Sequence, residues 1–137
     1  MITVQRIENK ERGVTASLNI KKGTTIEVAP VSVVPANQIA KISKTTIFRY
    51  YFVRPIEYHS ARTTETNTIK QVNGYLVFGL ASLCNHKNEP NAHVNWVEDA
   101  IGWWSHLIAK KDINAGEEIT LFYTNIEEYP DANQFSH

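Results

Sequence analysis

Short runs of β-branched and aromatic residues recur along the chain, separated by polar or glycine-containing segments. Such closely spaced runs are typical of a protein built mainly of β-strands. They predict strands over residues 2–7, 14–18, 24–28, 31–34, 47–53, 75–78, 93–97, 101–108 and 119–123. Helix is predicted only for residues 37–44, which follow a proline, and for a short turn over residues 79–83. Residues 59–73 are rich in Thr and Asn and predict an exposed loop.

One pattern occurs twice. The spacing Ala-x3-Ile-x2-Gly-x2-Ile begins at Ala16 and again at Ala109. It describes a strand end, a tight turn whose glycine adopts positive φ, and a second strand that returns an isoleucine to the core. Two copies are too few for a solenoid. The repeat therefore predicts two similar turns.

Length and composition indicate one domain over residues 1–137. The chain has 137 residues, 42% of them apolar and 20% charged, and a chain of this size can bury a core without a metal or disulfide. Cys84 is the only cysteine, which favours a reducing compartment and excludes a disulfide framework. The N-terminal residues lack the apolar core of a signal peptide, and no stretch is long enough to span a membrane. We expect a cytoplasmic protein, with no membrane partner.

The net charge is zero, but its distribution is uneven. Residues 1–72 hold eleven Lys/Arg and five Asp/Glu, whereas residues 73–137 hold three and nine. The two halves can neutralise each other in the fold. Alternatively the short acidic tail, about residues 125–137, attracts a cationic partner through Glu127, Glu128 and Asp131. Direct nucleic-acid binding is not expected, because the basic residues form no stripe.

Several kinds of active site are disfavoured. The chain has no Gly-x-Gly-x-x-Gly and no phosphate-binding loop of the Walker type. Its five histidines show no i, i+4 pairing, so no metal is predicted. Cys84 and His86 leave open a thiol nucleophile, although the apolar neighbours Leu80 and Leu83 favour a buried, inert cysteine.

Two separated motifs carry the most information. The first is Asn-His-x3-Pro-Asn, from Asn85 to Asn91, and the second is Gly-Glu-Glu-Ile-Thr-x2-Tyr, from Gly116 to Tyr123. Asn85 and Tyr123 are 38 residues apart. Together and in this order, the motifs resemble the SET-domain family of S-adenosylmethionine-dependent protein lysine methyltransferases.

The resemblance covers nearly the whole chain and implies a fold. In that family several small β-sheets combine with one or two short helices, and the C-terminal segment forms a pseudoknot, an exception to unknotted topology. The two similar turns would then lie on opposite sides of the architecture. Without Cys-rich pre-SET or post-SET zinc elements, the chain is similar to the minimal, stand-alone SET domains of viruses and bacteria.

The resemblance also implies roles for individual residues. Asn85, His86 and the backbone at Arg12 and Gly13 would hold S-adenosylmethionine, which leaves as S-adenosylhomocysteine. Tyr123 matches the family's essential tyrosine.

The substrate side of the site is assigned in the same way. Tyr51, with Tyr50 as the register alternative, would line the lysine channel. Leu121, Phe122 and Glu127 would contact a basic, histone-like protein substrate, which implies a nuclear location if that substrate is chromatin. Leu121 stands where relatives often carry Phe or Tyr, so di- or trimethylated product is expected. Either a monomer or a homodimer is compatible with the sequence.

The chain departs from the family pattern at three places. Glu11 replaces the first glycine of the cofactor loop, Lys87 replaces the serine after Asn-His, and Thr124 replaces a glycine that often follows the tyrosine. A carboxylate at position 11 would weaken binding if it faced the carboxylate of the cofactor. A noncatalytic SET-like module that binds cofactor or peptide is therefore the alternative function.

Overall fold

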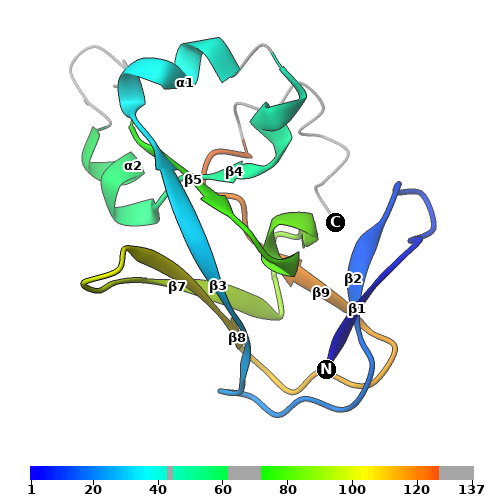
Figure 1. Ribbon diagram of the computed structural model, residues 1–137. Coiled ribbons are helices and arrows are strands. Elements are labelled where there is room, and N and C mark those ends of the chain that lie inside the picture. The colour runs from blue at the N-terminus through cyan, green and yellow to red at the C-terminus, as the bar shows by residue number, and fades with distance from the viewer. Residues whose placement is uncertain (43–44, 62–71, 127–137) are drawn as a thin grey trace.

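A computed structural model describes residues 1–42, 45–61 and 72–126, and it is built mainly of strands, as predicted. A four-stranded sheet has the order β1-β2-β9-β6, and a five-stranded sheet has the order β4-β5-β3-β8-β7 (Figure 1). The first contains β1 (Ile2–Gln5), β2 (Gly13–Ala16), β6 (Asn85–His86) and β9 (Glu118–Leu121). The second contains β3 (Thr25–Val34), β4 (Tyr51–Phe52), β5 (Gly74–Val77), β7 (Ala92–Glu98) and β8 (Trp103–Ala109).

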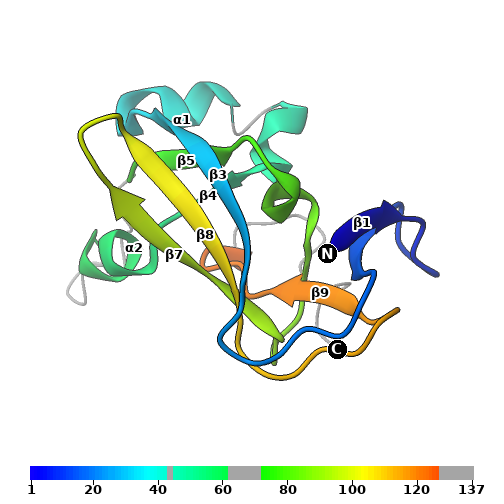
Figure 2. The same cartoon turned by 60° about the horizontal axis from the view of Figure 1, so that its bottom comes forward.

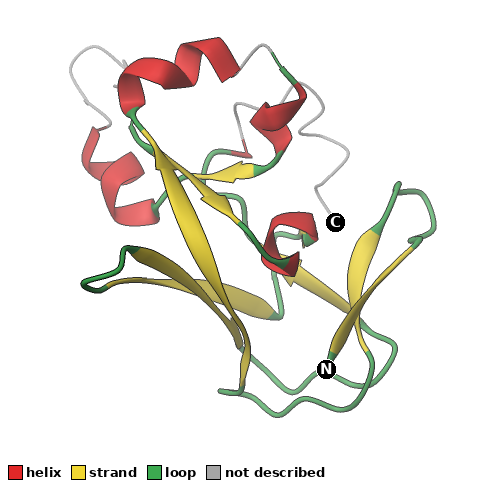
Figure 3. Ribbon diagram, viewed as in Figure 1, coloured by secondary structure: helices red, strands yellow, loops and turns green. Residues whose placement is uncertain are grey.

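The two α-helices are short and lie away from the β1–β2 hairpin (Figure 3). Helices α1 (Ala36–Ile42) and α2 (Pro55–Ala61) lie near the end of β3 that leads into α1, and the turned view places the hairpin at the far side of the molecule (Figure 2). Two 3₁₀ helices, η1 (Thr46–Arg49) and η2 (Leu80–Leu83), precede β4 and β6. None of the helices in the described ranges is long and apolar enough to cross a membrane.

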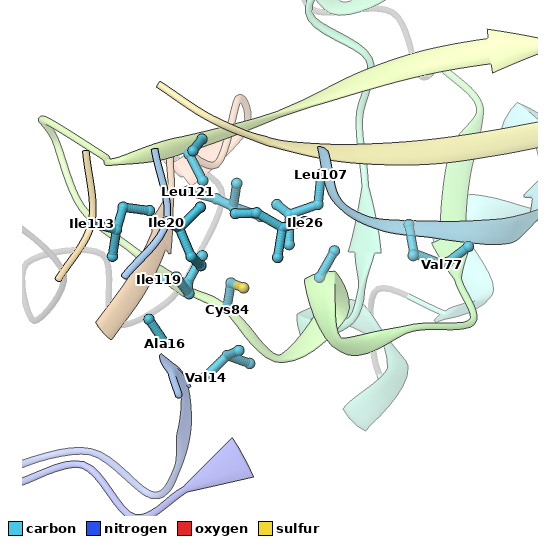
Figure 4. Packing of buried hydrophobic residues seen from close by; sticks show 14 residues of the cluster. Val14, Ala16, Ile20, Ile26, Val77, Cys84, Leu107, Ile113, Ile119 and Leu121 are labelled. Atoms are coloured by element: carbon cyan, nitrogen blue, oxygen red, sulfur yellow. The ribbon is translucent and has the colours of Figure 1, made fainter. Parts of the chain in front are cut away.

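The main core joins the two sheets. Val14 of β2 and Ile119 of β9 pack in one cluster with Leu107 of β8, and all three are fully buried (Figure 4). Burying such side chains removes apolar surface from water and contributes about 1.5–3 kcal/mol each. A second cluster, with Ile39 and Tyr58, lies between the helices and β4. The sheets are thus held by a shared core.

The two repeated turns contact each other. Gly23 and Gly116 both have positive φ, 88° and 90°, as the repeat predicts. Ile20 and Ile113 form an antiparallel bridge, and the two backbones exchange hydrogen bonds of 2.8 Å. The expectation that these turns lie on opposite sides of the fold is therefore wrong.

A parallel strand pair brings together segments far apart in the sequence. Asn85 and His86 of β6 pair with Thr120 and Leu121 of β9. Asn91 also binds β9, because its side chain donates to the carbonyl of Glu118 (2.8 Å) and accepts from the N–H of Thr120 (2.9 Å). The C-terminal motif is thereby fixed beside the Asn-His motif.

Three of the predicted strands need correction. The strands expected over residues 24–28 and 31–34 form one strand, β3, which passes through Pro30. Pro30 pairs with Trp104 of β8, but its carbonyl accepts from the Phe78 N–H and therefore faces the β5 side. The missing N–H faces the same side, where pairing with β5 begins only at Val31, so it interrupts no ladder bond. The strand expected over residues 47–53 begins instead as η1, where the Thr45 side chain caps the N–H of Ile47.

The first three residues of the predicted loop over residues 59–73 are helical. Residues 59–61 belong to α2, whose first residue is a proline, a favoured position because the first helical N–H needs no partner. Residues 62–71 lie outside the described part of the chain, as does most of the predicted acidic tail. The predicted helix over residues 37–44 corresponds to α1, and the predicted turn over residues 79–83 to η2.

Candidate active site

Two cavities meet at Tyr123. A cleft of about 1150 Å³ lies between the loop of the β1–β2 hairpin and the segment from Ser82 to Asn85. A smaller pocket of about 250 Å³ lies on the other side of Tyr123. Among the described residues, four line both cavities: Arg49, Tyr50, Ser82 and Tyr123. We call these four residues the partition. A molecule in the cleft and a side chain in the pocket would face each other across it.

The smaller pocket is largely aromatic. Its lining includes six aromatic residues, which are Tyr50, Tyr51, Phe52, Trp96, Phe122 and Tyr123. Tyr51 is 3% exposed and reaches only this pocket, whereas Tyr50 reaches both cavities. Both tyrosines predicted for the channel are thus present. Leu121 and Phe122, which are predicted to contact the substrate, line the same pocket, while Glu127 lies outside the described residues.

Tyr123 is held at both its backbone and its hydroxyl. The hydroxyl donates to the carbonyl of Cys84 at 2.6 Å, and the backbone N–H donates to Nδ1 of His86 at 2.8 Å. Because Nδ1 accepts, the neutral His86 ring carries its proton on Nε2, which faces Asn88 Oδ1 at 3.1 Å. The Tyr123 ring is thereby fixed between the two cavities.

His86 is a buried support for this tyrosine. Its side chain belongs to neither cavity lining, and the residue is 2% exposed. Burial lowers the pKa of His86, more than its bond to Asn88 raises it, so the ring is neutral at neutral pH. The backbone of His86 stays a predicted cofactor contact, while its side chain has a positioning role that sequence reasoning did not assign.

Asn85 organises the wall of the cleft. Its side-chain nitrogen donates to the Arg12 carbonyl at 3.0 Å and to Oε2 of Glu118 at 2.6 Å. Oε1 of Glu118 in turn contacts the Lys10 ammonium at 3.3 Å. The amide therefore ties the hairpin loop to β9. Glu118 received no role from the sequence, although it is the second acid of the Gly-Glu-Glu-Ile motif.

Gly13 permits this close approach. A Cβ at this position would lie 2.6 Å from Oε2 of Glu118 and 2.8 Å from Nδ2 of Asn85. Atoms cannot approach so closely without displacement. A side chain at position 13 would therefore displace Glu118 and Asn85, next to Arg12, which lines the cleft.

A comparison with protein families identifies the family of this chain. The sequence profile of the SET domain matches residues 11–124. The chain belongs to the SET-domain family. A comparison with curated proteins found no match.

Solved structures show the same fold for this SET domain. A candidate histone methyltransferase of Plasmodium falciparum has a TM-score of 0.66 at 20% identity, over 90% of this chain and 96% of the other. The histone lysine methyltransferase DIM-5 of Neurospora has a TM-score of 0.65 at 21% identity, over 89% of this chain and 51% of the other. A Chaetomium thermophilum Polycomb complex bound to S-adenosylmethionine has a TM-score of 0.63 at 16% identity, over 97% and 16%.

The cleft of this SET domain carries a surplus of positive charge. Glu11 is exposed and lines the cleft, as does Glu8. Four cationic residues share that lining, namely Arg6, Lys10, Arg12 and Arg49. Because Lys10 already pairs with Glu118 at 3.3 Å, the excess over these two carboxylates is one positive charge, which can still attract an anionic group. The side chain of Lys87 is exposed. Its backbone N–H donates to the Leu121 carbonyl at 2.9 Å.

The setting of Cys84 is that of an inert cysteine. The residue is 1% exposed, its Sγ lies 3.7 Å from the Leu80 carbonyl, and burial raises the pKa of the thiol. A thiol nucleophile needs access and a lowered pKa, and Cys84 has neither. The contribution of Cys84 to the site is its carbonyl oxygen, which orients Tyr123.

Proposed function

We propose that this SET domain is an S-adenosylmethionine-dependent methyltransferase that acts on a lysine side chain of a protein. The observation that carries the proposal is the partition at Tyr123, which separates a large charged cleft from a narrow aromatic pocket. A transfer reaction needs donor and acceptor aligned on opposite sides of one opening. Membership of the SET-domain family and the likeness to histone lysine methyltransferases support the same reaction.

The residues around the cleft fit S-adenosylmethionine. The cleft is large enough for a ligand of this size, and its extra cations suit the carboxylate end of the cofactor. Arg12 and Asn85 would border the cofactor, with Gly13 keeping the wall close behind them. When bound, the cofactor supplies a methyl group on a positively charged sulfur, and transfer forms an N–C bond as the S–C bond breaks.

The aromatic pocket can prepare the acceptor. A lysine with a pKa of about 10.4 is neutral in only about one of 2,500 molecules at pH 7, so its deprotonation costs about 4.6 kcal/mol. Desolvation lowers the pKa of an ammonium, and so does a nearby positive charge. The lining of Tyr50, Tyr51 and Phe52 provides the water-poor surroundings. The amine would reach the partition in its reactive, neutral form.

Tyr123 would orient the reacting groups and not act as the base. A phenol has a pKa of about 10 and keeps its proton at neutral pH. In Tyr123 that proton points to the Cys84 carbonyl, and the lone pairs of a phenol oxygen can act as acceptors. These lone pairs attract the ammonium or the polarised methyl group. The proton of the substrate then leaves through water.

The alternative is a module that binds without turnover, favoured by Glu11 in the cofactor loop. Calorimetry with S-adenosylmethionine, followed by a radiolabelled methyl assay on histones and lysine peptides, separates the two. Binding with transfer supports the methyltransferase. Binding without transfer to any protein or peptide supports the module. The absence of cofactor binding contradicts the methyltransferase and leaves only a module that binds peptide.

A further inference from the structure

The rim of the aromatic pocket is basic. Among the described residues that line this pocket, four carry basic side chains, and these are Arg49, His59, His93 and Lys110. All four are exposed, whereas Tyr51 and Leu121 deeper in the pocket are buried. No Asp or Glu occurs among the described lining residues. We call these four residues the basic rim.

Two members of the basic rim are fixed side by side. Lys110 follows β8, and its backbone N–H donates to the carbonyl of Asn91 at 2.8 Å, two residues before His93 on β7. Burial lowers the pKa of His93, and so does the nearby charge of Lys110, so Lys110 carries the positive charge of this pair at neutral pH. Lys110 forms no ion pair within the ranges that the structure describes. Its charge therefore acts on whatever enters the pocket.

We propose that the target lysine of this SET domain is flanked by acidic residues, whose carboxylates contact the basic rim at the ammonium of Lys110. The proposal rests on the proposed function, since it names the substrate class of the same site. A basic-flanked lysine would bring cations against cations, whereas acidic flanks place opposite charges together. It opposes the expectation of a histone-like substrate, which was drawn from Glu127, Glu128 and Asp131, outside the described residues.

The size of the effect follows from Coulomb's law. Two unit charges about 6 Å apart in water change a binding constant about threefold. Reversing Lys110 to glutamate turns one attraction into a repulsion, so it changes the constant about tenfold. The effect shrinks as salt rises, because exposed charges are screened over about 8–10 Å at physiological ionic strength.

The test compares peptides that contain one lysine flanked by glutamate, serine or arginine. Methyl transfer is measured as kcat/KM with S-adenosylmethionine, and peptide binding is measured separately by fluorescence anisotropy at low ionic strength. The variants are Lys110→Glu and Lys110→Arg. The matched control is Lys111→Glu, because Lys111 is also exposed but lines neither cavity.

The expected result is a preference for the glutamate-flanked peptide, lost about tenfold in Lys110→Glu and kept in Lys110→Arg and Lys111→Glu. A preference for the arginine-flanked peptide overturns the proposal, as do equal effects of Lys110→Glu and Lys111→Glu. Lys110-dependent binding of the acidic peptide without methylation supports the basic rim but contradicts the proposed reaction. Methylation with no dependence on flanking charge supports the proposed reaction but contradicts the role of the basic rim.

Discussion

Replacing Tyr123 with phenylalanine isolates one oxygen atom of the site. Tyr123→Phe keeps the ring, and it keeps the backbone N–H bond to His86 at 2.8 Å. It removes the hydroxyl that donates to the Cys84 carbonyl at 2.6 Å. The variant should therefore fold with an intact partition but without the oxygen that orients the reacting groups.

The loss of stability can be bounded. Leaving a buried carbonyl without its donor costs about 1–3 kcal/mol. Domains of this size commonly have about 5–15 kcal/mol of stability, so the variant stays almost fully folded. The loss of kcat should be larger, about 100-fold or more, which is the usual effect of removing one preorganised polar contact from a reaction centre. Partial unfolding cannot produce a loss of that size.

The assay measures kcat with saturating S-adenosylmethionine, the cofactor Kd by calorimetry and the Tm by calorimetric melting. Tyr75→Phe is the matched control, because its hydroxyl donates to Oε1 of Glu57 at 2.5 Å and it lines neither cavity. Both variants should lose a few degrees of Tm, but only Tyr123→Phe should lose kcat. Wild-type turnover in Tyr123→Phe would refute the role of the hydroxyl.

Three further predictions concern the cleft, the buried histidine and the product. Gly13→Ala should weaken cofactor binding in calorimetry and lower the stability by about 1–3 kcal/mol, because its Cβ displaces Glu118 and Asn85. The control is Gly23→Ala, whose Cβ meets nothing and which should leave the cofactor Kd unchanged. Because burial lowers the pKa of His86, its stabilising effect is complete above pH of about 6.5 and is lost as pH falls toward the folded pKa. Tm should therefore drop on acidification, and a slope unchanged in His86→Asn would contradict this. Leu121 should allow di- or trimethyllysine, and Leu121→Tyr, which crowds the pocket, should shift the mass spectrum toward monomethyllysine.

The strands that could be predicted are those whose pattern reflects local burial. In β7, Ala92, Val94 and Trp96 are less exposed than His93 and Asn95 between them, and that alternation of apolar and polar residues is visible in the sequence. The two-residue strand β6 has no such pattern, because Asn85 and His86 are polar and pair with β9 from 35 residues away. Its existence depends on a long-range contact that no local window contains.

The candidate site was predictable to the extent that it depends on motifs. Resemblance to the SET-domain family led to Asn85 and Tyr123, and the structure brings both to the same cleft. The link from Glu118 to Lys10 spans 108 residues, and nothing in the local sequence around either residue indicates it. The basic rim was missed for the same reason, since its members come from η1, α2, β7 and the end of β8.

The segment from Cys84 to His86 controls both cavities at once. The Cys84 carbonyl and the His86 ring hold Tyr123, while the Asn85 side chain, between them, holds the Arg12 carbonyl and Glu118. Successive side chains on an extended strand point to opposite sides, so one short strand can position the tyrosine with one face and the cleft wall with the other. Two polar side chains such as Asn85 and His86 in a buried strand lower stability unless their polar atoms form hydrogen bonds. Here the hydrogen bonds to Arg12, Glu118 and Tyr123 also position parts of the site. The Asn-His motif therefore links the position of the cofactor wall to the position of the Tyr123 hydroxyl.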